Sequence, residues 1–452
     1  MKEMIHIYHT NDLHSHLEHW PRIRDFLKKR KKWHEEEKDN VFLFDVGDHV
    51  DRWHPFTEGT LGKGNVALMN EVGYNAITIG NNEGITLDHD DLDSLYDKAE
   101  FDVIIGNLYT MEDDIPSWVD TYKIYTTKSG MKIGVIGLTA NFGNFYEPLG
   151  WKVTAPMDEL SHLINKVKPM TDYVILLSHL GIKDDEWIAE QFPEVDIILG
   201  AHTHHILREG KEINNSLLGA AGKYGQFVGH IILEVDTVSK KLLSRQAQLY
   251  EHQELPKSPL EEMEIENWFA EGKKLLDQPV AFLDTELKAD WFQLSPLPQL
   301  LADGLLEWCG ADCAFLNAGL LLSGLRIGEV TKYDLHKILP HPINPCLIEL
   351  TGAELKEVIK QTFDEKWPHL QIKGLGFRGK VMGNFIYSGI TIGNNGQTLR
   401  IQGNIIDPKG KYKLATTDMF TFGHFFPELH RAPKKYFMPE FMRDIMEWKL
   451  KQ

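Results

Sequence analysis

The chain has 452 residues, too many for one ordinary hydrophobic core, and at about 100 to 200 residues per domain we expect two domains. Hydrophobic residues make up 42% and aromatic residues 10%, which excludes a largely disordered protein. The net charge of -18 excludes a general binder of nucleic-acid polymers, because such proteins carry an excess of Lys and Arg. A small anionic substrate stays open, since bound divalent metals reverse the local field.

The sequence also indicates a compartment. No apolar run reaches the roughly 18 residues expected of a membrane-spanning helix, and the N-terminus shows no apolar segment of a secretory signal. The three cysteines, Cys309, Cys313 and Cys346, are an odd number and lack the spacing of a zinc site. We therefore expect a reduced cytoplasmic protein with no membrane partner. The sequence gives no indication of the oligomeric state.

Polar residues follow several predicted strands of the N-terminal half. The strands are expected over residues 4–10, 41–46, 74–79, 172–177 and 195–199, and the residues after them are Asp12 and His14, Asp48, Asn81, His179, and His202 and His204. Helices are expected over 20–39, 64–73 and 155–170, with further strands over 101–106 and 132–138. Each polar residue alone is read more simply as a surface or core side chain. Together they fit one rim of oxygen and imidazole donors, which suits Zn, Mn or Fe.

Asp48 is the centre of this prediction. The buried strand before it stops at Gly47, which lets the backbone turn, and ligands bind at the carboxyl edge of such strands. We therefore predict that Asp48 bridges two metal ions. The pairs Asp12/His14 and His202/His204 are two residues apart, so on an extended backbone each pair can face one ion.

The second half of the chain has a different character. A hairpin over 228–250 closes a first domain (1–250), and the acidic, proline-bounded stretch 251–279 is expected to be a helical linker with solvated charges. The second domain (280–452) has expected helices over 297–309 and 352–363 and strands over 391–406 and 411–416. Four aromatic residues lie within 420–426. They indicate either core packing or a stacking slot for a planar base.

These motifs resemble those of the 5'-nucleotidase family, in which a calcineurin-like metallophosphoesterase domain precedes a family-specific C-terminal domain. The resemblance rests on Asp12-Leu13-His14, Gly47-Asp48, Gly80-Asn81, Ser178-His179 and Gly200-Ala201-His202-Thr203-His204, and more loosely on Leu316-Asn317-Ala318-Gly319 and Leu350-Thr351-Gly352-Ala353-Glu354-Leu355. It implies an α/β (α+β) fold: a four-layer metallophosphoesterase β-sandwich flanked by helices, with a second, smaller α+β domain.

The resemblance also implies a set of site residues. One metal would take Asp12, His14, Asp48 and His204, and the second Asp48, Asn81, His179 and His202. The catalytic candidates of this chain are Asp48, Asn81 and Asn82, of which Asn82 could donate a hydrogen bond to the charge that develops in the reaction. The C-terminal domain would hold a nucleoside between aromatic rings, with Asn317, Arg326, Phe385, Tyr387, Phe420, Phe422 and Phe425 as candidates, and domain rotation would carry the substrate to the metals.

The chain departs from the family pattern at several positions. Where family members have a His and, three residues later, an Asp that assist the transition state or leaving group, this chain has Asn82 and Ile85. A phosphate-clamping arginine is replaced by Leu322, with Arg326 nearby as a substitute. Family members are also commonly exported.

These features predict a function. We expect a metal-dependent phosphohydrolase that acts on nucleotides or related phosphoesters, in which a water between the two ions attacks phosphorus in line. The alternative is a nucleotide-binding or sensing protein with little turnover, because the dyad is missing.

Overall fold

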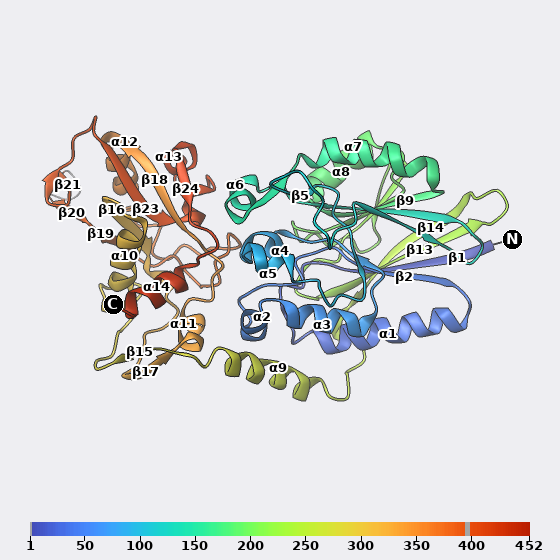
Figure 1. Ribbon diagram of the computed structural model, residues 1–452, viewed down its shortest axis with the longest axis horizontal. Coiled ribbons are helices and arrows are strands. Elements are labelled where there is room, and N and C mark those ends of the chain that lie inside the picture. The colour runs from blue at the N-terminus through green and yellow to red at the C-terminus, as the bar shows by residue number, and fades with distance from the viewer. Residues whose placement is uncertain (1, 394–397) are drawn as a thin grey trace. The chain divides into compact units, whose positions relative to one another are not determined.

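The computed structural model describes residues 2–393 and 398–452, and the chain forms two compact units, residues 1–272 and 273–452 (Figure 1). Among the described residues no helix is both long and apolar enough to cross a bilayer. The predicted strand segment 391–406 contains residues 394–397, which lie outside the described residues.

Two six-stranded sheets form the first unit. One has the order β14-β13-β1-β2-β3-β4 and the other β11-β12-β10-β9-β7-β6. The strands of the first sheet are β1 (Lys2–Thr10), β2 (Asn40–Asp45), β3 (Ala76–Ile77), β4 (Asp102–Val103), β13 (Phe227–Asp236) and β14 (Leu242–Glu251). Those of the second are β6 (Tyr122–Thr126), β7 (Lys132–Thr139), β9 (Tyr173–His179), β10 (Ile197–Gly200), β11 (Lys211–Ile213) and β12 (Ser216–Gly219), and β5 (Leu108–Thr110) pairs with β8 (Trp151–Val153) outside both.

Alternation along the strands builds two hydrophobic cores. In β7, Ile133 and Val135 face the first sheet and pack with Ile7 and Phe44, whereas Ile136 and Leu138 belong to a second core. Because successive strand residues point to opposite faces, both faces of this sheet are buried. The second core includes apolar residues of α7 (Pro156–Val167) and α8 (Ile182–Gln191).

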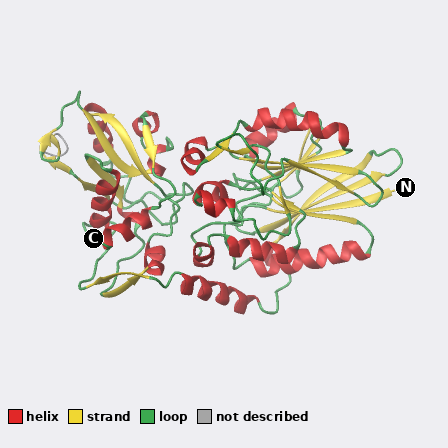
Figure 2. Ribbon diagram, in the orientation of Figure 1, coloured by secondary structure: helices red, strands yellow, loops and turns green. Residues whose placement is uncertain are grey.

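Helices cover the outer faces of the two sheets (Figure 2). The covering helices are α1 (Trp20–Glu36), α3 (Lys63–Val72), α7 and α8. The other helices of this part of the chain are α2 (Pro55–Thr60), α4 (Asn81–Thr86), α5 (His89–Asp93), α6 (Gly143–Tyr146) and α9 (Glu261–Leu275). With α1 and α3 beside the first sheet and α7 and α8 on the second, the unit has the four layers of the predicted sandwich. The fold class predicted from the sequence is confirmed.

The stretch predicted as a linker contains α9, whose residues up to Gly272 belong to the first unit. Arg22 Nη2 lies 2.7 Å from Glu261 Oε1, and Arg24 Nη1 lies 2.9 Å from Glu264 Oε1. A Cβ added at Gly272 would lie 2.2 Å from the backbone nitrogen of Phe56. The expectation that these acidic side chains are merely solvated is therefore wrong for Glu261 and Glu264. The division into 1–250, 251–279 and 280–452 stays a prediction.

A five-stranded sheet organises the second unit, in the order β19-β16-β23-β18-β24. Its strands are β16 (Cys313–Asn317), β18 (Pro345–Thr351), β19 (Phe385–Ser388), β23 (Lys411–Thr417) and β24 (Lys434–Tyr436), with helices α10 (Pro296–Cys309), α11 (Lys332–Ile338), α12 (Gly352–Gln361), α13 (Pro427–Arg431) and α14 (Met442–Leu450). Two small sheets join β15 (Pro279–Leu283) to β17 (Gly328–Thr331) and β20 (Ile390–Gly393) to β21 (Thr398–Ile401) and β22 (Asn404–Ile405).

One buried carboxyl of the second unit gives a testable dependence of stability on pH. Burial raises the pKa of Asp418 from 3.8 to about 7. Between these values the unfolded chain has released this proton and the folded chain retains it, so this group lowers the free energy of unfolding as the pH rises. The loss is up to about 1.4 kcal/mol per pH unit. We expect urea unfolding of Asp418→Asn to lack this component between pH 4 and 7; equal pH dependence in both proteins would contradict the assignment.

Candidate dinuclear metal centre

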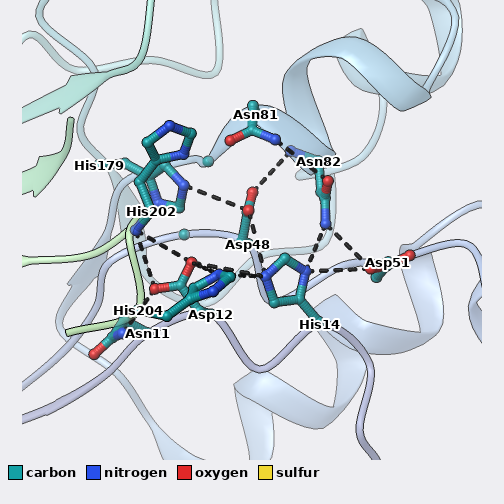
Figure 3. Close-up of polar contacts among 12 residues, drawn as sticks. Asn11, Asp12, His14, Asp48, Asp51, Asn81, Asn82, His179, His202 and His204 are labelled. Carbon is teal, nitrogen blue, oxygen red and sulfur yellow. Dashed lines mark hydrogen bonds and ion pairs between the residues drawn. The ribbon is translucent and has the colours of Figure 1, made fainter. Parts of the chain in front are cut away.

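The seven predicted metal ligands of the first unit lie together in space (Figure 3). They lie at the ends of two neighbouring strands of each sheet and at the start of one helix. Asp12 and His14 follow β1, Asp48 follows β2, Asn81 begins α4, His179 ends β9, and His202 and His204 follow β10. Two groups of three donor atoms form within this set, and both include Asp12. The first adds His14 and His204, and the second adds Asp48 and His179.

Asp48 stands between imidazoles from both sheets. Its Oδ2 lies 3.4 Å from His179 Nε2 and 3.7 Å from His14 Nε2, while its Oδ1 accepts a 2.7 Å hydrogen bond from the Asn82 backbone. Asp12 Oδ1 lies 3.4 Å from His204 Nε2. These separations are longer than the roughly 2.7–3.2 Å of an ordinary hydrogen bond. They match the distance of about 3.4 Å between ligand atoms that each lie about 2.1 Å from one tetrahedral ion.

Unpartnered donor atoms support the same interpretation. Among the described residues, His179 Nε2 and Asn81 Oδ1 are buried and have no hydrogen-bond partner. The other nitrogen of His179, Nδ1, donates to the backbone oxygen of Val46 at 2.6 Å, which leaves Nε2 as the nitrogen that faces Asp48. Buried polar atoms without partners are rare in native proteins, so this donor set fits a pair of divalent ions.

The surroundings of Asp48 and His179 shift the pKa values of both side chains in a way that favours an ionised carboxylate at Asp48. Burial alone would raise the pKa of Asp48, but the neighbouring imidazoles, His179 first, hold it well below its usual range. Burial alone would lower the pKa of His179, and the Asp48 carboxylate outweighs this and raises it to about 10. The carboxylate therefore stays ionised and attracts positive charge, which divalent ions would supply.

The backbone at the ligands corrects one prediction. Asp12 has φ +50° and His14 has φ +48°, and His202 and His204 have φ +70° and +58°. These residues have the left-handed backbone conformation, so the expectation that each pair lies on an extended segment is wrong. Asp48, at φ +53°, shares this conformation, which costs side-chain-bearing residues energy and persists where surrounding contacts enforce it.

Glu83 joins the two loops that carry Asp48 and Asn81, a role that sequence reasoning missed. Its carboxylate accepts hydrogen bonds from the backbone nitrogens of Asp48 (3.0 Å), Val50 (2.8 Å) and Gly80 (2.9 Å). A Cβ at Gly80 would lie 2.0 Å from Asp48 Oδ1, so this position requires glycine. The sequence feature that could have indicated this role is an acidic residue three positions after Gly80, at the start of a helix.

Asn82 occupies the family's histidine position and lies on the outer side of His14. Its amide nitrogen is 2.7 Å from His14 Nδ1 and 3.3 Å from Asp51 Oδ2, and Asp51 Oδ2 is 3.2 Å from the same nitrogen of His14. His14 Nε2, on the opposite side of the ring, faces Asp12, Asp48 and His204. Asn82 and Asp51 are therefore placed to orient His14. Sequence reasoning did not assign Asp51.

This arrangement predicts a specific effect of Asn82→Ala. Loss of a side chain that orients a metal-ligating histidine typically weakens metal affinity about 10- to 100-fold. We expect a loss of that size for one of two Mn²⁺ ions in calorimetric titrations of metal-stripped protein, with an unchanged circular dichroism spectrum. Asn215→Ala, at an exposed position, is the control. Equal affinities in the two variants would show that Asn82 does not position His14.

The predicted substrate residues lie in the second unit, in different environments. Phe385 and Phe420 are 8% and 0% exposed, and their ring centroids are 5.7 Å apart in a core cluster. Phe422, Phe425 and Tyr387 are partly buried, and Tyr387 Oη lies 2.5 Å from Thr362 Oγ1. Asn317 is buried and donates to the Met382 oxygen at 2.9 Å, whereas Arg326 is exposed. In these positions Phe385 and Phe420 pack in the core. Core packing was the alternative to a base-stacking slot that the sequence had allowed for the aromatic residues.

A two-sheet sandwich with clustered carboxylates, imidazoles and an amide at the strand ends defines a metallophosphoesterase-type centre. Residues 5–205 match the calcineurin-like phosphoesterase family, and residues 276–425 match the 5'-nucleotidase C-terminal domain. The chain is similar over 100% of both lengths, at 44% identity, to the uncharacterized metallophosphoesterase YunD of Bacillus subtilis (strain 168).

Solved structures show the same fold. The NAD nucleotidase of Haemophilus influenzae superposes with a TM-score of 0.68 at 16% identity, covering 100% of this chain and 96% of that one. The 5'-nucleotidase precursor from Thermus thermophilus gives 0.61 at 18% identity, covering 99% and 96%. The chain therefore belongs to the 5'-nucleotidase family of calcineurin-like metallophosphoesterases, and it is a phosphoesterase.

Proposed function

We propose that the protein releases phosphate from nucleotides or closely related phosphoesters, using two divalent ions held by the seven residues Asp12, His14, Asp48, Asn81, His179, His202 and His204. The observation that carries this proposal is the position of the Asp48 carboxylate, 3.4 Å from His179 Nε2 on one side and 3.7 Å from His14 Nε2 on the other. Mn, Zn and Fe all accept this mixture of carboxylate, amide and imidazole ligands.

We assign a separate role in the reaction to each of several residues. When bound, two divalent ions supply an activated water nucleophile and offset the charge of the phosphoryl group. Asp48 sets the separation of the two positions, and Glu83 fixes the loops that carry Asp48 and Asn81. Asn82 and Asp51 orient His14. Asn82 has no acidic proton to give to a leaving group, and its amide nitrogen lies 2.7 Å from His14 Nδ1.

This geometry favours substrates whose leaving groups need no protonation. Acid assistance is typically worth about a hundred- to ten-thousand-fold in rate. We therefore propose that phosphoanhydrides and activated esters are turned over faster than simple nucleoside monophosphates. Asn317, Arg326 and the partly buried aromatic residues Tyr387, Phe422 and Phe425 are the proposed substrate contacts in the second unit.

The test is phosphate release by protein reconstituted with Mn²⁺ or Zn²⁺, across nucleoside mono-, di- and triphosphates, nucleotide sugars and cyclic nucleotides. Asp48→Ala is the blank. Release that the blank lacks, and that is faster for anhydrides than for monoesters, is the expected result. If no substrate exceeds the blank while the wild type still binds two ions and a nucleotide raises its Tm, the sensing alternative holds instead.

A further inference from the structure

A second cluster of histidines lies in the first unit, away from the dinuclear centre. His6 in β1, His34 in α1 and His230 in β13 are 7%, 1% and 3% exposed, and they bring one ligand atom each within 4.8 Å of one another. His6 is four residues before the end of β1, roughly 13 Å along the strand, and Asp12 lies beyond that end. The cluster is therefore a separate feature of the fold.

A carboxylate completes the cluster. Asp39, between α1 and β2, places its Oδ2 3.4 Å from His6 Nε2 and 3.7 Å from His34 Nδ1. Both distances exceed those of ordinary hydrogen bonds, and His34 Nδ1 is buried without a hydrogen-bond partner among the described residues. The spacing repeats that of the dinuclear centre, where ligand atoms lie 3.4 to 3.7 Å apart.

The remaining ring nitrogens are held by buried neighbours. His6 Nδ1 lies 3.0 Å from His230 Nε2, and His34 Nε2 lies 2.9 Å from the hydroxyl of Tyr8. Metal-ligating histidines usually have their second nitrogen anchored in this way. Burial lowers the pKa of His34 to about 4 and also lowers that of His6, so the rings are neutral and their lone pairs are available.

We propose that His6, His34 and Asp39 bind a third transition-metal ion of the Zn²⁺ type, with His230 and Tyr8 orienting the two imidazoles. Two imidazoles and one carboxylate are a common ligand set for such ions and leave at least one position for water. The Asp39 side chain is 29% exposed, which gives the site a route to solvent.

Binding requires a local rearrangement of the two rings. The rings of His6 and His34 stack with centroids 3.7 Å apart and planes at 24°. Each nitrogen lone pair lies in its ring plane, so the two planes must open further to meet at one ion. The bound ion would then tie the C-terminal turn of α1 to β1, which makes the site structural rather than catalytic.

The test counts ions in the full-length protein. After stripping, exposure to Zn²⁺ and dialysis, elemental analysis is expected to find three ions per wild-type chain and two in Asp39→Asn and in His34→Gln. His162→Gln, at an exposed position of α7, is the control and should retain three. Asp39 is partly exposed, so its variant decides the question even if His34→Gln fails to fold.

The dinuclear centre can be separated from this result. In the Asp48→Ala background the third ion is expected to remain, and Asp39→Asn should remove it. In Co²⁺-loaded Asp48→Ala protein, the same replacement should abolish the visible absorption. Two ions in the wild type, or unchanged counts in Asp39→Asn, would overturn the third site whether or not the protein hydrolyses nucleotides.

Discussion

Replacing Asp48 with asparagine is expected to lower kcat/KM for every phosphoester that the protein hydrolyses by about a thousand-fold or more. The reason is the position of its carboxylate between His14 and His179, where it would hold both ions. Metal ions contribute several kcal/mol of transition-state stabilisation, and each 1.4 kcal/mol is about tenfold in rate. In the same preparation, the rate of phosphate release and the number of bound ions found by elemental analysis should both decrease.

Asp45→Asn is the matched control for this experiment. Asp45 is also a buried carboxyl of the same segment, but burial raises its pKa to about 8, so it is mostly neutral at pH 7 and asparagine resembles it closely. Its oxygens accept hydrogen bonds from the Thr10 hydroxyl and the Gly47 nitrogen. We expect this variant to retain both ions and activity within a few-fold. An active Asp48→Asn protein with two bound ions would refute the bridging role.

Restoring the family's dyad is the second change with a large expected effect. Asn82→His combined with Ile85→Asp should speed hydrolysis of nucleoside monophosphates about a hundred-fold, the lower end of what acid assistance provides. Positions 82 and 85 are three residues apart in α4, so they lie on one face of the helix and the introduced carboxylate can hold the imidazole. The rates should be compared at saturating Mn²⁺, because the change also removes the Asn82 contact to His14.

The substrate dependence separates acid assistance from a general effect. A nitrophenyl phosphate has a leaving group that needs no proton, so its rate should change little in the double variant. Each single replacement serves as a control, and neither should reproduce the full gain. An equal gain for both substrates would show that the replacements alter metal binding rather than proton delivery.

Much of the metal centre could be predicted from the sequence because strand ends have a fixed place in this type of sheet. The strands β1, β2, β9 and β10 were indicated by apolar runs that stop at a glycine or at a polar pair. The order of these runs along the chain gave the positions of the candidate ligands. Local patterns carry no information about the backbone between such strands. The left-handed conformation at Asp12 and His14 depends on hydrogen bonds to the loop after β2, as when His14 donates its backbone N–H to the Asp48 oxygen.

The substrate side could not be predicted in the same way. A run of aromatic residues gives the same sequence pattern whether its rings fill a core or line a surface. Only the tertiary packing showed that Phe420 lies in the core. The charges of α9 were equally ambiguous, since their partners Arg22 and Arg24 lie more than two hundred residues earlier in the chain. The role of Asn82 depended on the direction of one amide, which no sequence pattern specifies.

The left-handed backbone at Asp12, His14, Asp48, His202 and His204 has a consequence for local unfolding. Each such residue costs about 1–2 kcal/mol relative to a relaxed conformation, and the surrounding sheets do not share this cost. When the ions are stripped, these loops should become the least protected segments of the first unit. Amide hydrogens there would exchange early while the strands of both sheets remain closed, so exchange at these loops would report whether the ions are bound.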